Sequence, residues 1–262
     1  MNRREGFSLT ELLTVVSIST LMVSIMLPAM SNVKTKLRST MCTSNLQQLG
    51  QIFTMYTDDN DGKFMKRGCS YGSGAVSWFH CLRNYHDPND DLIFCPLAVD
   101  TIPDGGRNPY MAWLNTTETD PPAYYEGSYG INLWVANGDS CAWDPDPNGF
   151  ERLCWRTPTV TGASSVPLLV CSQWKDIQPH PTDEPLEYES LLWTGGPFNE
   201  MQRPCIKRHA PYSVNVLFLD AAIDSRTIKE LWLLKWHQMW PAGCDHVPVW
   251  PEWMDDVPDP CP

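Results

Sequence analysis

The sequence predicts an α+β protein in which a long N-terminal helix packs on a mainly antiparallel β-sheet. Three observations lead to this prediction: an apolar run over residues 7–27, an apolar stripe at helical spacing as far as Tyr56, and short β-branched runs further along. The 23 prolines and the lack of long periodic segments past residue 60 exclude a helical bundle. Ten cysteines without a CxxC pair favour an oxidising compartment, so we expect irregular loops that carry disulfides.

The net charge limits the classes of partner. The 262 residues include 31 acidic and 19 basic side chains, which leaves a charge of −12. Proteins that bind nucleic acid need a basic surface, so no nucleic-acid partner is expected.

The first apolar run is long enough to cross a membrane. Residues 7–27 contain one ionisable side chain, Glu11, and a helix of this length would extend about 31 Å. Arg3 and Arg4 would hold the N-terminus on the cytoplasmic side, although three basic residues also follow between positions 34 and 38.

Glu11 is the exceptional residue of this run. An ionised group inside a membrane helix costs on the order of 2–3 kcal/mol or more, so it needs a partner. A free α-amino group would serve, and cleavage between Gly6 and Phe7 would create one. The amine of Phe7 in one copy would then meet Glu11 of a neighbour and set the register of an assembly.

Residues 3–13, RREGFSLTELL, resemble the class III signal of type IV pilins and type II secretion pseudopilins. The resemblance implies cleavage after Gly6 by a prepilin peptidase that also methylates Phe7. Pro28 lies where many pilins carry a helix-bending proline. The further partners implied are other pilin-like subunits and assembly-platform proteins. The implied location is the bacterial inner membrane, with a single pass, a cytoplasmic N-terminus and a periplasmic or extracellular globular domain.

Three simpler interpretations of the N-terminus remain open. A secretory signal peptide has the same polar and apolar regions, and small residues would permit a cut after Ser31. A plain single-pass anchor is the second interpretation. In the third, Glu11 extends to the membrane interface and has no role in assembly.

The helix is expected to continue beyond Pro28 along one apolar stripe and to end at Asp58–Gly62. The stripe consists of Val33, Leu37, Met41, Cys42, Leu46, Leu49, Phe53 and Tyr56. Helices are predicted at 76–85 and 227–236, and strands at 92–95, 129–135, 166–174 and 214–219, with a returning strand from Ile223. The acidic, proline-rich tail should be irregular and pinned by Cys244 and Cys261.

A second resemblance covers the globular part in outline. Residues 42–62, the Cys95-Pro96 step and a His209 to Asp220 segment look like a large bacterial family of pseudopilin-like proteins with an H-x9-DG region. Here ten residues separate His209 from Asp220, and Ala-Ala follows the aspartate in place of Gly-His. The resemblance suggests a disulfide that joins helix to sheet, with Cys42 and Cys95 as its candidates.

No catalytic constellation accompanies these motifs. His209 and Asp220 lack a nucleophile motif, so structural roles at strand ends are expected. Asp58–Gly62 lacks the distal glutamate of an EF-hand, so a helix-capping turn is favoured over calcium. The His80-Cys81 and Cys244-Asp245-His246 groups lack paired zinc-ligand spacing, and no metal site is predicted.

Together these features divide the chain into a leader (1–6), a transmembrane and assembly helix (7–30), a pilin-like α+β domain (31–240) and an acidic Pro/Trp-rich tail (241–262). The leading hypothesis is a non-enzymatic fibre subunit of a type II secretion or type IV pilus-type system. The alternative is a membrane-anchored module that binds glycans or proteins, with Trp250 and Trp253 as the tryptophans most exposed.

Overall fold

The computed structural model describes residues 8–65, 77–86, 90–98, 111–116, 124–137, 150–188, 199–204, 206–209 and 211–261. Gly6 and Phe7, on which the cleavage prediction rests, lie outside these ranges. The architecture is α+β, as expected, with one long helix and a mixed five-stranded sheet.

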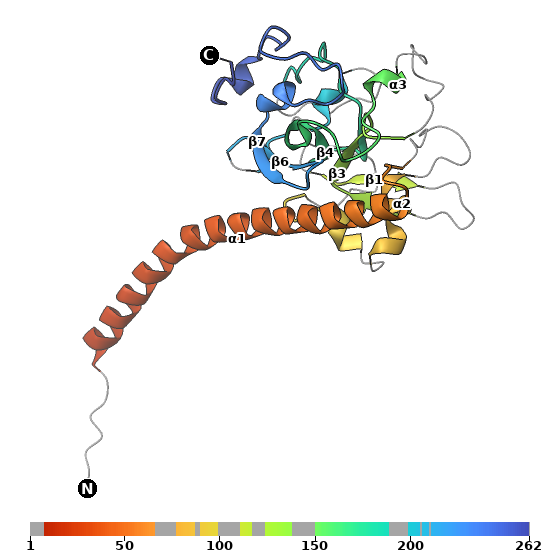
Figure 1. Cartoon of the computed structure of the whole chain (residues 1–262). Helices are drawn as coiled ribbons and strands as arrows, with labels where there is room; N and C mark the ends of the chain where they lie inside the picture. The colour runs from red at the N-terminus through yellow and green to blue at the C-terminus, as the bar shows by residue number, and fades with distance from the viewer. Residues whose placement is uncertain are drawn as a thin grey trace.

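Helix α1 (Leu9–Asp59) contains 51 residues and continues through Pro28. Figure 1 shows that the helix is curved and that its N-terminal part projects away from the globular part. A proline removes one backbone hydrogen bond and crowds the preceding turn, which is a physical cause of bending. Whether Pro28 itself sets the curvature stays a prediction.

The helix ends where the sequence predicts. Asn60 is its C-cap residue, and the Gly62 amide donates to the Thr57 carbonyl oxygen at 2.8 Å. Gly62 has a φ of +72°, a conformation that glycine adopts without steric cost. The Asp58–Gly62 segment therefore works as a helix-capping turn.

The main sheet has the strand order β5-β3-β4-β6-β7, and three of its four neighbouring pairs are antiparallel. Its strands are β3 (Tyr129–Asn132), β4 (Pro167–Cys171), β5 (Asp176–Ile177), β6 (Ser213–Phe218) and β7 (Ile223–Thr227). Strands β1 (Trp113–Thr116) and β2 (Tyr124–Gly127) form a separate antiparallel pair. The runs predicted at 129–135, 166–174, 214–219 and from Ile223 thus all contain strands.

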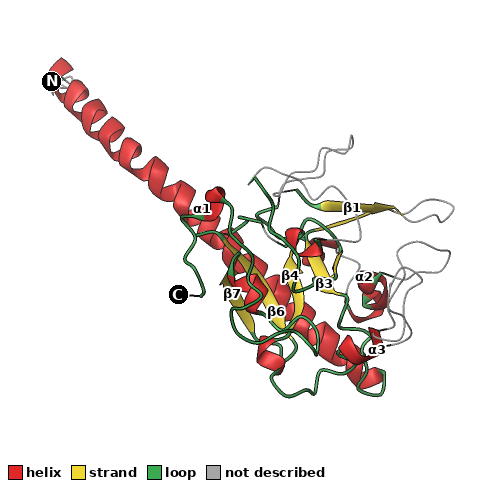
Figure 2. Cartoon of the chain, turned by 90° about the horizontal axis from the view of Figure 1, so that it is seen from above, coloured by secondary structure: helices red, strands yellow, loops and turns green. Residues whose placement is uncertain are grey.

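The C-terminal half of α1 lies across one face of this sheet, as the two views in Figures 1 and 2 agree. Cys42, Leu46, Leu49 and Phe53 are buried against it. Gly50 permits a close approach, because a Cβ there would lie 3.1 Å from the Leu217 side chain.

The first part of the predicted stripe was wrong. Val33, Leu37 and Met41 are each more than half exposed, so packing on the globular part begins only near Cys42. Periodicity identifies the apolar face of a helix, but it does not show where the surface beneath that face ends.

The remaining helices are short. They are α2 (Trp78–Cys81), α3 (Phe150–Leu153), η1 (Arg83–Tyr85), η2 (Asp90–Ile93), η3 (Ala163–Ser165), η4 (Glu200–Gln202), η5 (Glu230–Leu233) and η6 (Glu252–Met254). The helix predicted at 76–85 is confirmed in part, since α2 and η1 form two separate short turns there and residue 76 lies outside the described residues. The strand predicted at 92–95 was wrong, since a 3₁₀ turn ends there.

The helix predicted at 227–236 was also wrong. Strand β7 reaches Thr227 and only η5 follows it. A single turn is sufficient, because the indole N–H of Trp232 donates to the Asp183 carbonyl oxygen and that of Trp236 to Leu231. These bonds place both rings in the core without a longer helix.

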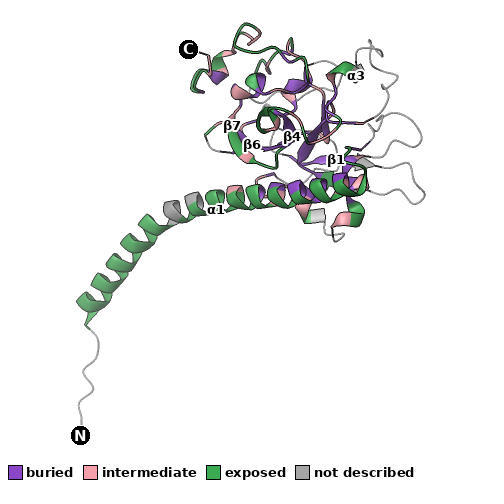
Figure 3. Ribbon diagram, in the orientation of Figure 1, coloured by how far each residue is buried: buried purple, intermediate pink, exposed green. Residues whose placement is uncertain are grey.

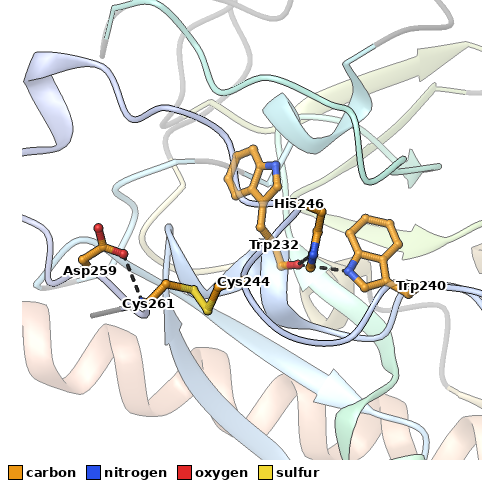
Figure 4. The surroundings of a disulfide bond; sticks show 6 residues. All are labelled: Trp232, Trp240, Cys244, His246, Asp259 and Cys261. Carbon is orange, nitrogen blue, oxygen red and sulfur yellow. Dashed lines mark hydrogen bonds between the residues drawn. A yellow bond between two sulfur atoms is a disulfide. The ribbon is translucent and has the colours of Figure 1, made fainter.

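The C-terminal segment covers the side of the sheet opposite α1 (Figure 1). Cys244 and Cys261 form the one disulfide found among the described residues, which confirms that this pair pins the tail. Figure 4 shows the disulfide beside Trp232, whose carbonyl oxygen accepts the indole N–H of Trp240 and contacts His246. The tail is irregular, as predicted, and it packs against the rest of the globular part.

Candidate functional site

The N-terminal half of α1 exposes apolar side chains on all of its sides. Every large apolar residue from Leu9 to Met26 is more than half exposed, and Figure 3 shows this part of α1 uniformly exposed. A helix that is apolar all round is normally buried in a core or in a membrane. None of the described residues of the globular part covers this segment.

The length of this segment suits a bilayer. Leu9–Met26 is apolar enough to cross a membrane, and its 18 residues extend about 27 Å as a helix. Of the described residues, only these form such a helix.

Glu11 lies in the first turn of α1 and is bound to Ser8 in a capping box. The Glu11 amide donates to Ser8 Oγ at 3.3 Å, and Glu11 Oε2 accepts from the Ser8 amide at 2.9 Å and the Ser8 hydroxyl at 2.7 Å. The carboxylate therefore has partners in its own chain. Its pairing with the Phe7 amine of a neighbour stays a prediction, because Phe7 lies outside the described residues.

A second constellation lies where α1 meets the sheet. Three thiols and an imidazole converge there, with all four ligand atoms within 4.8 Å of one another. The residues are Cys42, Cys95, Cys171 and His209, which we call the Cys3His cluster. All four are buried, with exposed fractions of 0–2%.

Four separate segments supply the cluster. Cys42 comes from α1, Cys95 from the turn after η2, Cys171 from the end of β4, and His209 from a bridge that precedes β6. Sγ of Cys171 lies 3.6 Å from Sγ of Cys42 and 3.3 Å from Nε2 of His209, which is itself 3.6 Å from Sγ of Cys95.

The predicted disulfide between Cys42 and Cys95 is absent, since both cysteines are unbonded. They do lie close together, as the resemblance suggested, with Cys42 on α1 and Cys95 in the turn after η2. Cys171 and His209 lie at the same site, so Cys42 and Cys95 have two further neighbours there.

Polar groups fix the orientation of the cluster. Ser39 Oγ lies 3.0 Å from Nδ1 of His209, and the Tyr129 hydroxyl donates to Sγ of Cys42 at 3.3 Å. The Cys95 amide donates to the Ser128 hydroxyl. The buried Arg208 donates to the Ser128 and Ser172 carbonyl oxygens at 2.9 and 3.2 Å.

The three thiols of the cluster titrate together. Hydrogen bonds from Cys171 and Cys42 lower the pKa of Cys95, to which the charge of Arg208 adds. Burial raises the pKa of Cys42 to about 12 and that of Cys171 well above its ordinary value.

The other predicted site residues do not join these two constellations. Asp220 accepts a hydrogen bond from the Ala222 amide in the turn after β6, a structural role as expected. Trp250 and Trp253 are only half-buried, and they are engaged: Trp250 packs edge-on against Trp232, and the Trp253 indole donates to the Leu186 carbonyl oxygen.

No protein-family model matches this chain, and no curated protein and no solved structure matches it.

Proposed function

We propose that this chain is a non-enzymatic subunit of a pilus-like or pseudopilus-like fibre of a type II secretion or type IV pilus-type system. It is made as a membrane-anchored precursor, cleaved after Gly6 and methylated at Phe7. The observation that carries the proposal is the division of α1 into an apolar half without cover and a half that belongs to the core of the globular part.

The exposed apolar half of α1 would be surrounded first by lipid, in the precursor, and then by other subunits, in the fibre. Burying a Leu, Ile, Val or Met side chain contributes about 1.5–3 kcal/mol, so a helix with an apolar surface on all sides strongly favours a bilayer. Outside the bilayer, bundling with the same segment of other copies is the arrangement that covers the whole circumference. One segment therefore serves first as an anchor and then as the core of a fibre.

The proposal assigns distinct roles to the parts of the chain. The prepilin peptidase would act at Gly6 on the cytoplasmic side of the inner membrane, and the globular part would face the periplasm or exterior. Glu11 would exchange its Ser8 hydrogen bonds for the methylated amine of a neighbouring Phe7, which sets the spacing of subunits. Assembly-platform proteins and other pilin-like subunits are the partners.

The mature N-terminus tests the processing step. Intact mass and N-terminal sequencing of the protein from cells should give methyl-phenylalanine from residue 7. A chain that begins at Asn32 would identify an ordinary secretory signal peptide, and a chain that keeps residues 1–6 would identify a plain anchor. Either result would overturn the proposal.

The charge of Glu11 can be tested separately from its capping role. Glutamine can replace glutamate in a capping box, so Glu11→Gln should preserve the start of α1 and membrane insertion. It should block incorporation into the fibre, as should Glu11→Ala. Normal incorporation of Glu11→Gln would refute the charge pairing.

The capping box also favours the alternative function. Because Ser8 already satisfies the Glu11 carboxylate, a permanently anchored binding module needs no neighbour at this position. Such a module would insert in the membrane but would not form a fibre. The same assay would then find no incorporation even of the wild-type chain.

A further inference from the structure

We propose that Cys42, Cys95, Cys171 and His209 bind one zinc ion that fastens α1 to the sheet. This inference does not depend on the proposed function, because it concerns the interior of the globular part.

The geometry matches a tetrahedral zinc site. Zn–S bonds of about 2.3 Å and Zn–N bonds of about 2.0–2.1 Å imply edges of about 3.8 Å between sulfurs and about 3.6 Å between sulfur and nitrogen. Three of the six edges are 3.6 Å for Cys42 to Cys171, 3.6 Å for Cys95 to His209 and 3.3 Å for Cys171 to His209. All four ligand atoms lie within 4.8 Å of one another, so small shifts of the side chains would bring each of them to bonding distance of one ion.

The donor set selects zinc and closes the site. Three thiolates with one imidazole is a usual set for structural zinc, and four protein ligands leave no open position for catalysis. The three thiols would release their protons on binding, and His209 would bind as the neutral imidazole through Nε2. The resulting site has a net charge of −1.

The surroundings supply the partners that such a site needs. Ser39 lies against Nδ1 of His209, which holds the ring with Nε2 toward the sulfurs. The Tyr129 hydroxyl donates to Sγ of Cys42. Arg208 precedes His209 in the chain and is bound to the carbonyl oxygen of Ser172, the residue after Cys171. Its buried guanidinium thus places a positive charge next to a site of charge −1.

The position of the site indicates its purpose. Cys42 marks the point where α1 first becomes buried, and β4 is the middle strand of the sheet. An ion held here joins α1, the η2 turn, β4 and the start of β6 in one centre.

A disulfide is the competing use of these cysteines in an oxidising compartment. A disulfide bond requires sulfurs about 2.05 Å apart and uses only two thiols, so it would leave one buried cysteine and His209 without a role. Coordination of one metal ion uses all four side chains, and zinc is the usual ion for this donor set.

The test begins with the full chain, purified in detergent without chelators or nickel resin. Elemental analysis by mass spectrometry should find about one zinc per chain. Non-reducing peptide mapping should show Cys42, Cys95 and Cys171 unlinked and Cys244 linked to Cys261. Absence of zinc, another metal in its place, or a disulfide between any two cluster cysteines would each overturn the proposal.

Matched variants locate the ion. Cys171→Ala should lose the zinc, whereas Cys81→Ala, at a part-buried cysteine on α2 outside the cluster, should retain it.

Because Cys171→Ala can also fail to fold, a milder variant is needed. Ser39→Ala should weaken zinc affinity about 10–100-fold, while the exposed Ser44→Ala should leave it unchanged. Equal affinity in Ser39→Ala and Ser44→Ala would contradict the assigned orientation of His209.

Cobalt gives a spectroscopic check on the wild-type chain. Replacement of zinc by cobalt(II) should produce the visible absorption bands and the charge-transfer band of tetrahedral thiolate coordination. An octahedral cobalt spectrum without sulfur charge transfer would exclude the Cys3His site.

Discussion

The two halves of α1 belong to one continuous helix but have opposite environments. From Leu9 to Met26 every large apolar side chain is exposed, whereas Cys42, Leu46 and Leu49 are completely buried. The first half is apolar all round and the second on one face. Figure 3 shows the first half exposed and the second partly buried. Both halves are helical, so helix formation alone does not distinguish them. A helix that is apolar on every side suits contact with other molecules, whereas a helix that is apolar on one face suits packing on a core.

The strongest way to break this comparison is to truncate one leucine in each half. Leu46→Ala should lower the free energy of unfolding of the globular part by about 2–5 kcal/mol, because it opens a cavity between α1 and the sheet. Leu13→Ala, at a side chain 64% exposed, should change it by less than about 0.5 kcal/mol. Tryptophan fluorescence during denaturation in detergent reports this directly, since all twelve tryptophans lie at or beyond Trp78. Equal losses in the two variants would show that both halves belong to one core.

The pH sharpens the comparison, because the buried titratable groups among the described residues all lie in the globular part. Burial raises the pKa of Glu200 to about 7, although Arg203 at 2.7 Å partly offsets this. The folded state then binds more protons than the unfolded state, whose pKa is near 4.5. Glu200 therefore contributes stability below pH 4.5 that is lost as the pH rises through 7, by on the order of 3 kcal/mol.

Glu200→Gln isolates this contribution. Burial lowers the pKa of His237 to about 4. This residue therefore has the opposite effect, because its contribution to the free energy of unfolding is lost as the pH falls from 6.5 to 4. Wild type and variant share the pH dependence that comes from His237. The difference between their free energies of unfolding, measured at pH 4.5 and at pH 7.5, therefore reports the contribution of Glu200. An unchanged difference across that range would contradict the assignment, and membrane association of the apolar half should not respond to either change.

The smallest expected effects concern two turns that border the packed half of α1. Ala221 has a φ of +64°, so Ala221→Gly should stabilise the globular part by about 0.5–1 kcal/mol. Gly62 has a φ of +72° at the end of α1, and Gly62→Ala should destabilise it by about 1 kcal/mol. Chemical denaturation of the two variants should therefore shift in opposite directions, and a shift of the same sign in both would refute the backbone argument.

Local patterns in the sequence predicted much of this fold. The β-branched runs identified β4, β6 and β7, and turn residues identified the end of α1. The Ser8–Glu11 capping box was missed, although its S-x-x-E spacing is visible in the sequence. The same glutamate carries the charge that the resemblance to pilins assigns to assembly, so one residue has two interpretations.

The Cys3His cluster could not have been predicted from spacing. Its members come from four segments that only the packing of α1 on the sheet brings together, and none forms a close pair in sequence. The resemblance pointed to Cys42 and Cys95 as neighbours, but it did not include Cys171. His209 was noticed as a motif residue, and its partner proved to be the cluster and not Asp220.

Cross-linking between copies tests the central claim most directly. A cysteine placed at Val16 in the exposed half should form a ladder of oxidised oligomers in cells, because the account places this surface against neighbouring helices. The matched variant Met55→Cys, about equally exposed but in the packed half of α1, should remain uncross-linked. Monomers alone from Val16→Cys, in a protein that still inserts in the membrane, would contradict the fibre and leave an isolated anchor.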